Sequence, residues 1–572
     1  MSYFLKKTKP SSKGEYLQIY SGYYIPKVGK RNKSYKKIGD VQDLIAQGIE
    51  NPVEYYQKEV DKLNAKETEK KIAQITDVST CKYVGQFLVS SMIEKLNVKE
   101  IIKVMNSNLK IQYDMTDLIT SLICAQIVSP GSKLKAFEKV IPSLYGSKLF
   151  SYDQIIDGVK ILGNNYEKYI ELFNNQIAKI WPRNTTNLFF DCTNYYFEID
   201  LEDNVRKKGP SKENRKDPII GQALLLDSDQ IPIGMTMYPG NQSEKQFLRK
   251  SIEDLKHRYN VKGKTVQVAD KGLNCGDNIY AAVVESHDGY IFSKSVHGTN
   301  LNDVEKKWVL LEDELENKWT EVRDEDGKIL YKYKSCVDEF EYKHTVDGEK
   351  VSFKVKEKRI VTYNPTLARK QKTQIKKEVS KAEEKITLKG LTREEFGDCV
   401  KYVSFTATDK KGQNVKIAKE MNNEKIEEDL SFAGFNLLVT SEIDMNPEEI
   451  YNVYHGLWRI EDTFRVMKTY LEARPVFLQL IESIYGHFLI CYLGATILRL
   501  LELKVFEDQI PVTQLIDFIR DYRVTETGQG SFINNASSSR TFIKIKDKLG
   551  LMMLGNLILQ KKDIDNIFSC EL

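Results

Sequence analysis

The chain has 572 residues, too many for one hydrophobic core, and this length predicts about three to five domains. Hydrophobic residues make up 41% of the chain and charged residues 29%, which excludes a largely disordered protein. The 85 basic and 81 acidic residues leave a net charge of only +4, so the composition as a whole gives little support to a polyanionic partner.

The eight cysteines are scattered, without a Cys-x-x-Cys pair or a Cys/His cluster, and suggest neither a zinc site nor a disulfide framework. The N-terminus has no apolar segment of the kind found in signal peptides. The most apolar run, Phe488 to Leu498, is too short to cross a bilayer. We therefore expect a cytoplasmic protein with no membrane partner.

Residues 1–75 are predicted to form a small basic β region, because aromatic and polar residues alternate between positions 14 and 39. Six basic residues and no acidic one lie between Lys27 and Lys37, a larger surplus than that of the whole chain. This cluster is suited to neutralise phosphates. Its candidate contacts are Lys30, Arg31 and Lys33.

Residues 76–180 follow with apolar side chains at helical spacing, as between Leu118 and Ile123, interrupted at Ser129-Pro130-Gly131. We predict a helical DNA-binding region here. A helix-turn-helix is one arrangement that fits this pattern.

Residues 181–300 change to buried strands and one amphipathic helix. The predicted strands are 188–191, 219–226, 231–236 and 266–270, and the helix is 246–259. Three strands, a helix and a further strand form the opening order of an RNase H-like sheet, although other α/β folds share this order. We therefore predict a multidomain α/β protein whose core is a mixed sheet flanked by helices.

Residues 301–432 are predicted to be a β-rich insertion into this core, because the Asp326-Gly327 and Asp347-Gly348 turns join Tyr-, Val- and Lys-rich runs. A charged helical stretch near 369–385 lies within it. The chain then returns to the second part of the core.

The second part of the core is residues 433–505, and its first strand is predicted at 435–440. Asn446-Pro447 begins a long helix, with Asn as the cap and Pro at the first helical position. Residues 506–572 are predicted to be a C-terminal helical region.

Asp191 and Asp270 each end an apolar strand-like run, the place where open α/β sheets present functional groups. An Asp after a strand also begins many ordinary turns, so each residue alone has a purely structural explanation. The pair together suggests a metal site.

Glu461 shares a predicted helical face with apolar residues, among them Trp458 and Phe464, so we expect its carboxylate to be partly desolvated. A desolvated carboxylate needs a cation or a metal ion beside it. Two explanations stay open at this point, a metal ion and a salt bridge to Arg465 one turn later.

Three converging carboxylates suit phosphodiester chemistry. Two divalent ions about 3.5 to 4 Å apart activate the attacking oxygen and stabilise the leaving oxygen in such reactions. Magnesium prefers oxygen ligands, so Asp191, Asp270 and Glu461 are candidates to hold two Mg²⁺ ions, with Mn²⁺ as a substitute.

Five motifs follow one another along residues 180–500. They are Asp191-Cys192-Thr193-Asn194-Tyr195-Tyr196-Phe197, Gly209-Pro210-Ser211-Lys212, Gly240-Asn241-Gln242-Ser243-Glu244, Val268-Ala269-Asp270-Lys271-Gly272-Leu273 and Tyr454-His455-Gly456-Leu457-Trp458-Arg459-Ile460-Glu461. By these motifs the chain resembles bacterial insertion-sequence transposases of the DDE class, specifically the insertion-sequence-four superfamily. The resemblance implies an RNase H-like core with a β-rich insertion, in which Asp191, Asp270 and Glu461 are the catalytic metal ligands.

The superfamily signature is Tyr, two residues, Arg, three residues, Glu, six residues and Lys, and its Tyr, Glu and Lys correspond to Tyr454, Glu461 and Lys468. Leu457 stands where the signature has Arg, and Arg459 or Arg465 is a candidate replacement. Tyr454 and Lys468 lie about two helical turns from Glu461, where they would hold the DNA strand end.

Each of these two residues also has an alternative without a function: core packing for Tyr454, and a solvated helix position for Lys468. Thr193 is expected to brace the loop after Asp191. Lys212 and Arg215 are further candidate phosphate contacts, although surface basic residues are common.

The resulting hypothesis is a cut-and-paste transposase, a metal-dependent endonuclease and strand-transfer enzyme that acts on double-stranded DNA. Its DNA partners would be the terminal inverted repeats of an insertion sequence and the target DNA. The resemblance also implies a homodimer in the DNA complex and a location on the bacterial nucleoid. The alternatives are an RNase H-like nuclease without strand transfer and a domesticated or decayed DNA-binding protein.

Overall fold

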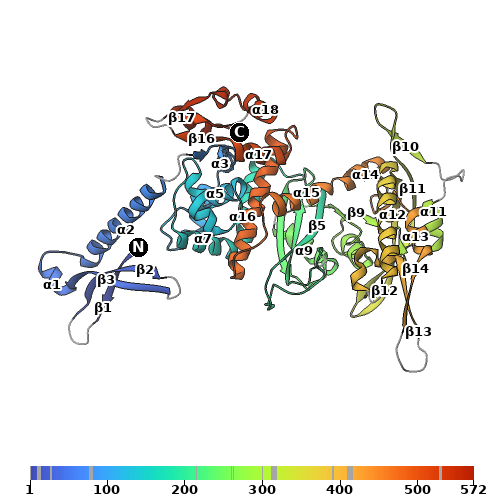
Figure 1. Cartoon of the computed structure of the whole chain (residues 1–572), viewed down its shortest axis with the longest axis horizontal. Coiled ribbons are helices and arrows are strands. Elements are labelled where there is room, and N and C mark those ends of the chain that lie inside the picture. Colours follow the sequence, from blue (N-terminus) through green and yellow to red (C-terminus); the bar gives the residue numbers. More distant parts are fainter. Residues whose placement is uncertain are drawn as a thin grey trace. The chain divides into compact units, whose positions relative to one another are not determined.

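The computed structural model describes residues 2–9, 14–25, 29–76, 81–213, 215–258, 261, 263–298, 301–310, 319–388, 392–408, 416–526, 531–536 and 538–572. The chain forms two compact units (Figure 1). The first contains Met1–Lys95, Asn106–Asp157 and Gln509–Leu572, and the second contains Leu96–Met105 and Gly158–Asp508. No helix in the described part of the chain combines the length and apolar character of a membrane span.

The first unit begins with an antiparallel sheet in the order β1 (Ser2–Thr8), β2 (Tyr16–Ile25) and β3 (Gly29–Asp40). The aromatic alternation predicted the β2–β3 pair, and β1 adds a third strand that was not predicted. Leu17 and Ile19 of β2 are completely buried, while most of β3 is exposed. Helices α1 (Val41–Ala46) and α2 (Pro52–Thr76) follow.

The rest of the first unit combines helices with a second small sheet. Its main helices are α3 (Phe87–Lys95), α5 (Met115–Val128), α17 (Val512–Asp521), α18 (Arg540–Leu549) and α19 (Lys561–Phe568). The sheet runs in the order β18 (Ile558–Gln560), β17 (Ser531–Asn534), β16 (Arg523–Glu526) and β4 (Cys81–Tyr83). The C-terminal region, which we predicted to be helical, carries α17, α18 and α19 but also β16, β17 and β18, which are too short to show a period-two pattern.

The second unit is built on one nine-stranded mixed sheet, in the order β10-β11-β12-β15-β9-β8-β5-β6-β7. Its strands are β5 (Asn187–Tyr196), β6 (Ile219–Leu226), β7 (Pro232–Pro239), β8 (Val266–Ala269), β9 (Gly289–Lys294), β10 (Thr320–Arg323), β11 (Ile329–Val346), β12 (Glu349–Tyr363) and β15 (Phe435–Thr440). Strands β5, β6 and β7 are antiparallel, and β8 and β9 run parallel to β5. The predicted α/β class with a mixed sheet is confirmed.

Helices cover both faces of β5. Leu188, Phe190 and Cys192 of β5 lie in the core that also contains residues of α9 (Glu244–Arg258). Side chains alternate along a strand, so the odd-numbered residues of β5 face the opposite side. There Tyr195 contacts Phe488 of α16 (Ile481–Leu500), their ring centroids 4.6 Å apart.

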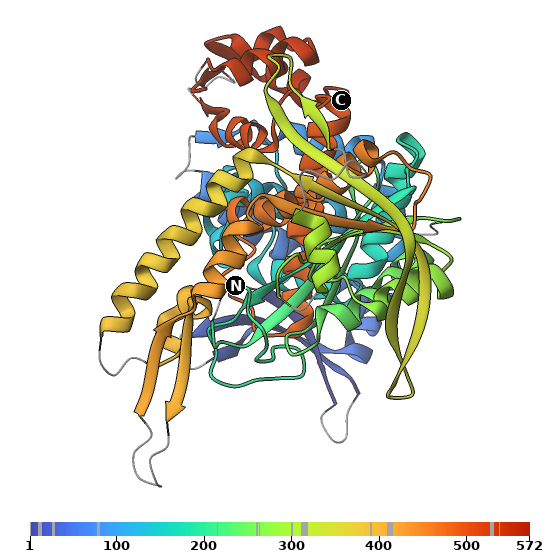
Figure 2. The same cartoon turned by 90° about the vertical axis from the view of Figure 1, so that its right-hand side faces the viewer.

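The segment 301–432, which we predicted to be a β-rich insertion, lies between β9 and β15 in the chain and adds β10, β11 and β12 to the main sheet. Strands β11 and β12 join at Asp347-Gly348, as the turn signal indicated, and form the long hairpin seen in Figure 2. Strand β12 then pairs with β15 of the core. The segment also carries α11 (Asp303–Leu310), α12 (Pro365–Thr387) and α13 (Asn423–Ser431), and the pair β13 (Val403–Thr408) and β14 (Lys416–Met421).

Candidate active site

Strand register brings the two predicted aspartates together. Strand β5 pairs in parallel with β8, with Phe189 opposite Val268, and β8 ends at Ala269. Continuing this register by two residues places Asp191 beside Asp270. We had expected Asp191 at a strand end, but β5 continues to Tyr196 because its ladder with β6 does. Asp270, in contrast, follows the end of its strand as predicted.

Glu461 reaches the same place on a helix. Asn446 caps α14 (Pro447–His455) by accepting a hydrogen bond from the Glu448 backbone N–H at 2.8 Å, as the sequence predicted. The predicted long helix is interrupted at Gly456, after which α15 (Trp458–Arg465) carries Glu461. A Cβ at Gly456 would lie 2.8 Å from Cε1 of Phe189, so glycine permits the helical segment to approach β5 closely.

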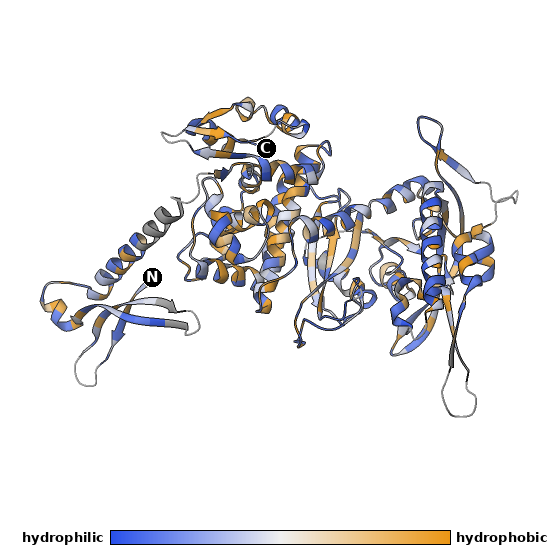
Figure 3. Ribbon diagram, in the orientation of Figure 1, coloured by the Kyte–Doolittle hydropathy of each residue, from blue (hydrophilic) through white to orange (hydrophobic). Residues whose placement is uncertain are grey.

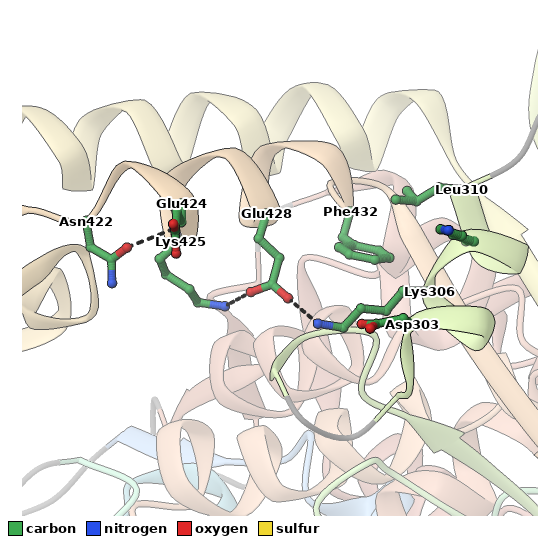
Figure 4. Close-up of a pocket in the computed structure, with 9 residues that line it drawn as sticks. Asp303, Lys306, Leu310, Asn422, Glu424, Lys425, Glu428 and Phe432 are labelled. Carbon is green, nitrogen blue, oxygen red and sulfur yellow. Dashed lines mark hydrogen bonds and ion pairs between the residues drawn. The ribbon is translucent and has the colours of Figure 1, made fainter.

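The three carboxylates line one cleft of about 480 Å³. The lining residues are Asp191, Cys192, Thr193, Lys212, Asp270, Tyr454, His455, Leu457, Trp458, Ile460, Glu461 and Phe464. Residues 270 positions apart in the sequence therefore meet at one surface of the second unit. A larger hollow of about 760 Å³ lies between α11 and α13, where Figure 4 shows Glu428 bonded to both Lys306 and Lys425. Because Glu428 is already paired with both lysines, this hollow is a weaker candidate for an active site than the cleft.

Like charges converge in the cleft. The pKa of Asp191 is raised to about 6, mainly by burial and to a smaller extent by Glu244 and Asp270, while Lys212 at 3.9 Å opposes the shift. Burial and the nearby Asp270 also raise the pKa of Glu461. The negative charge of Asp270 therefore makes ionisation of both Asp191 and Glu461 less favourable, and a bound cation would relieve this repulsion.

The donor set fits a hard divalent cation, since it consists of carboxylate oxygens around an accessible cleft. Backbone and side-chain donors already orient two of them. Cys192 N–H donates to Asp191 Oδ1 at 2.7 Å, and Ser293 and Tyr454 donate to Asp270 Oδ1 at 3.1 and 3.2 Å. Within the described ranges, however, no three His, Cys, Asp or Glu residues lie close enough together to share an ion.

Glu461 itself is more exposed than predicted, although Leu457 and Phe464 nearby are buried. The alternative salt bridge to Arg465 is not formed, because Arg465 pairs with Asp462. Of the two explanations that the sequence left open, the salt bridge to Arg465 is thus excluded, and a metal ion beside Glu461 stays a prediction.

Tyr454 and Lys468 both reach the neighbourhood of the carboxylates. The Tyr454 hydroxyl contacts Asp270, so this residue does more than pack in a core. Lys468 donates to Thr193 Oγ1 at 2.6 Å and lies 5.1 Å from the ring centre of Tyr195. Burial, with a smaller contribution from Arg474, lowers the pKa of Lys468 to about 8. The solvated alternative for Lys468 is therefore wrong, and Thr193 belongs to β5 instead of a loop.

Neither candidate for the missing signature arginine lies in the cleft. Arg459 is buried, and its guanidinium binds Gln230, Glu502 and Asp508 at 3.0, 3.3 and 3.0 Å. These bonds occupy the side chain inside the second unit, so Arg459 as a DNA contact was a wrong prediction. Arg465 is 61% exposed and pairs with Asp462, but it does not line the cleft.

Lys212 is the basic residue that lines the cleft. Its ammonium group donates to the Cys192 carbonyl and lies 3.6 Å from Glu244. Arg215 lies outside the lining, stacked on the Tyr196 ring at 3.7 Å and paired with Asp217 at 3.7 Å. The sequence did not point to Ser293, which donates a hydrogen bond to Asp270, because no motif marks β9.

The N-terminal candidates belong to the first unit. Arg31 and Lys33 are exposed on β3, the edge strand of its sheet, where phosphates would have access to them. Lys30 is in the same strand, but its side chain lies outside the described residues. Their role in DNA binding stays a prediction.

Comparison with known proteins gives little further information. No family model matches the chain, and no curated protein matches it. Among solved structures it is similar to piggyBac transposase in a synaptic complex with hairpin DNA, a cryo-EM structure. The TM-score is 0.33 with 11% identity, over 85% of this chain and 83% of that chain. A likeness at this level carries no argument about fold or function.

Proposed function

We propose that this protein is a DNA transposase of the DDE class with an RNase H-like core. The observation that carries the proposal is the single cleft lined by Asp191, Asp270 and Glu461, the three carboxylates of the motifs. The succession β5, β6, β7, α9 and β8 supports it, because three strands, a helix and a further strand open an RNase H-like sheet.

Asp191, Asp270 and Glu461 would hold two Mg²⁺ ions, or Mn²⁺ in their place. When bound, such ions supply the positive charge that stabilises both the attacking and the leaving oxygen at phosphorus. Tyr454 orients the Asp270 carboxylate through its hydroxyl. Lys212 places an ammonium group at the cleft, and Lys468 holds another one beside β5, where a DNA phosphate would bind.

The reaction would be hydrolysis of DNA at the element's ends, followed by attack of the freed 3′ hydroxyl on target DNA. The terminal inverted repeats would be the specific partner, and two protomers would bridge two ends. These finer steps are part of the proposal and follow from the motif resemblance.

The test uses a duplex that carries the inverted repeats flanking the gene, incubated with the full chain and Mg²⁺. We expect cleavage at the repeat ends, and joined products when a pre-cleaved end is supplied with target DNA. Asp191→Asn, Asp270→Asn and Glu461→Gln should each lose cleavage by at least about 100-fold. Glu449→Gln is the matched control, since Glu449 is an exposed carboxylate of α14 outside the cleft.

Full cleavage by any of the three cleft variants would overturn the assignment. Cleavage without joined products would indicate a nuclease on the same core. Sequence-specific binding without cleavage by the unaltered chain would indicate a DNA-binding protein that lacks enzymatic activity.

A further inference from the structure

Helix α12 carries a basic surface that the proposed cleft does not use. Between Pro365 and Lys377 the helix has five basic residues and no acidic one, and all five are exposed. We call Arg369, Lys370, Lys372, Lys376 and Lys377 the basic face of α12. Most of this helix is hydrophilic (Figure 3).

The fold turns this face outward. Ala368, Ile375 and Ala382 are the buried residues of α12, and their spacing of seven places them along one side of the helix. Lys370 and Lys377 lie roughly opposite that side. The helix is therefore fixed to the second unit by its apolar side, with its positive charges directed to solvent.

Among the described residues, the basic face of α12 has no acidic partner. In the parts of the chain that the structure describes, none of its five side chains forms an ion pair. The first acidic residue of α12, Glu378, instead accepts a salt bridge from Lys401 at 3.1 Å. Elsewhere in the same unit several basic residues are paired, as Lys306 is with Glu428. Unpaired positive charges in a row suit a polyanion.

A short chain of contacts connects α12 to the cleft. Asn364 caps the helix and also bonds to the Tyr451 side chain of α14. The Tyr451 ring lies 3.8 Å from that of His455, which lines the cleft. The first turn of α12 therefore begins close to the rim of the proposed active site.

We infer that the basic face of α12 binds the phosphate backbone of duplex DNA that leaves the cleft. This inference rests on the proposed function, which it deepens by assigning a second contact surface. The nine residues from Arg369 to Lys377 rise about 12 Å along the helix axis, which equals about three to four base pairs of B-form duplex. Lysine and arginine contacts to phosphates carry no sequence information, so the face would set affinity and orientation.

The test measures the affinity of the full chain for a 30-base-pair duplex, without divalent ions, at several KCl concentrations. One variant replaces all five residues of the basic face with Gln. Each lost phosphate contact reduces the slope of log affinity against log salt by about 0.9, so we expect a reduction of at least about 2. Thermal melting of each variant verifies that it is folded.

The matched control replaces five exposed lysines near the β10–β11–β12 strands with Gln: Lys328, Lys343, Lys350, Lys354 and Lys356. It removes the same charge from the same unit, but these lysines alternate with acidic residues such as Glu339, which pairs with Lys354. We expect its slope to change by less than about 1. If the fivefold variant does not fold, Lys370→Gln and Lys377→Gln tested singly should each reduce the slope by about 0.9.

An unchanged slope in the basic-face variants, or an equal change in the control, would overturn this inference. The salt dependence of DNA affinity can be measured whether or not the protein cleaves DNA. A reduced slope in a protein that never cleaves DNA would support the surface and count against the transposase. An active transposase with an unchanged slope would retain the proposed function and lose only the role of α12.

Discussion

The Lys468 ammonium group donates a hydrogen bond to Thr193 Oγ1 over 2.6 Å, and this contact joins the helical segment after Glu461 to the strand that carries Asp191. Lys468 belongs to the π-helical turn Val466–Tyr470 that continues α15. Two of the three elements that supply carboxylates to the cleft, β5 and α15, are thus tied together by a cation that burial makes easier to deprotonate.

Lys468 gives the first prediction, a pH dependence of DNA binding. Its pKa is lowered to about 8, so the side chain is charged below pH 8 and becomes neutral above it. We expect the affinity of the wild-type protein for a DNA end to fall between pH 7 and 9.5. Lys468→Arg keeps its charge over this range and should show a flatter profile. If fluorescence anisotropy titrations gave the same pH dependence of DNA affinity for the wild type and Lys468→Arg, a phosphate contact at Lys468 would be contradicted.

Asp191→Asn should make the protein more stable at neutral pH when no divalent ion is present. The folded-state pKa of Asp191 is raised to about 6, so above pH 6 its buried negative charge lowers the free energy of unfolding by the full amount. This destabilisation decreases as the pH falls through 6 and disappears at about pH 3, below the ordinary aspartate pKa, where the carboxyl is protonated in both states. Its side chain keeps 23% exposure, and we expect a gain of about 1 to 3 kcal/mol in urea unfolding at pH 7.5.

The gain should vanish at about pH 3, and added Mg²⁺ should stabilise the wild-type protein more than the variant. A variant that is less stable than the wild type at pH 7.5 would show that the Asp191 carboxylate is not destabilising. Thermal melting with EDTA and then with Mg²⁺ provides both comparisons.

Arg499→Met should destabilise the second unit strongly. The Arg499 guanidinium is almost completely buried and bonds to Asp462, Glu502 and Thr463. Its removal takes one basic partner from each of two buried carboxylates and leaves Arg465 beside Asp462 and Arg459 beside Glu502, so we expect a loss of about 3 to 5 kcal/mol. Arg465→Gln is the control, because Arg465 contacts the same Asp462 from the surface and should contribute less than about 1 kcal/mol. Equal losses of unfolding free energy in Arg499→Met and Arg465→Gln, measured by urea unfolding, would contradict this prediction.

Gly486→Ala should also lower stability, because α16 and α7 (Tyr152–Asn164) approach each other at glycines. A Cβ at Gly486 would lie 1.9 Å from the carbonyl oxygen of Val159, and one at Gly163 would lie 1.6 Å from that of Glu482. Backbone atoms cannot move aside cheaply, so we expect a loss of at least about 2 kcal/mol. Gly272→Ala, with nothing within 4 Å of its added Cβ, should change the unfolding free energy little.

Local patterns predicted the elements of the second unit well. The strand expected at 219–226 is β6, and the Asn446 cap begins α14 as expected. The side-chain alternation and capping chemistry that determine these elements are contained in neighbouring residues. The prediction that Asp191, Asp270 and Glu461 converge needed the motif resemblance, because no local pattern joins residues so far apart.

Long-range contacts account for what could not be predicted. The orientation of Arg459 depends on Glu502 and Asp508, more than forty residues later in the chain. Ser293 contacts Asp270 only because β9 lies beside β8 in the sheet. The pairing of β12 with β15 likewise depends on the whole sheet and not on the strand's own sequence.

The position of β15 between β9 and β12 limits how this chain can be shortened. If residues 301–432 were cut out, one side of β15 would lose its ladder and expose unpaired backbone N–H and C=O groups. Open strands of this kind recruit other chains, and Leu437, Leu438 and Val439 would make the new edge apolar. A minimal catalytic fragment made by such a deletion should therefore precipitate, whereas cutting within the Asp347-Gly348 hairpin turn should leave it in solution.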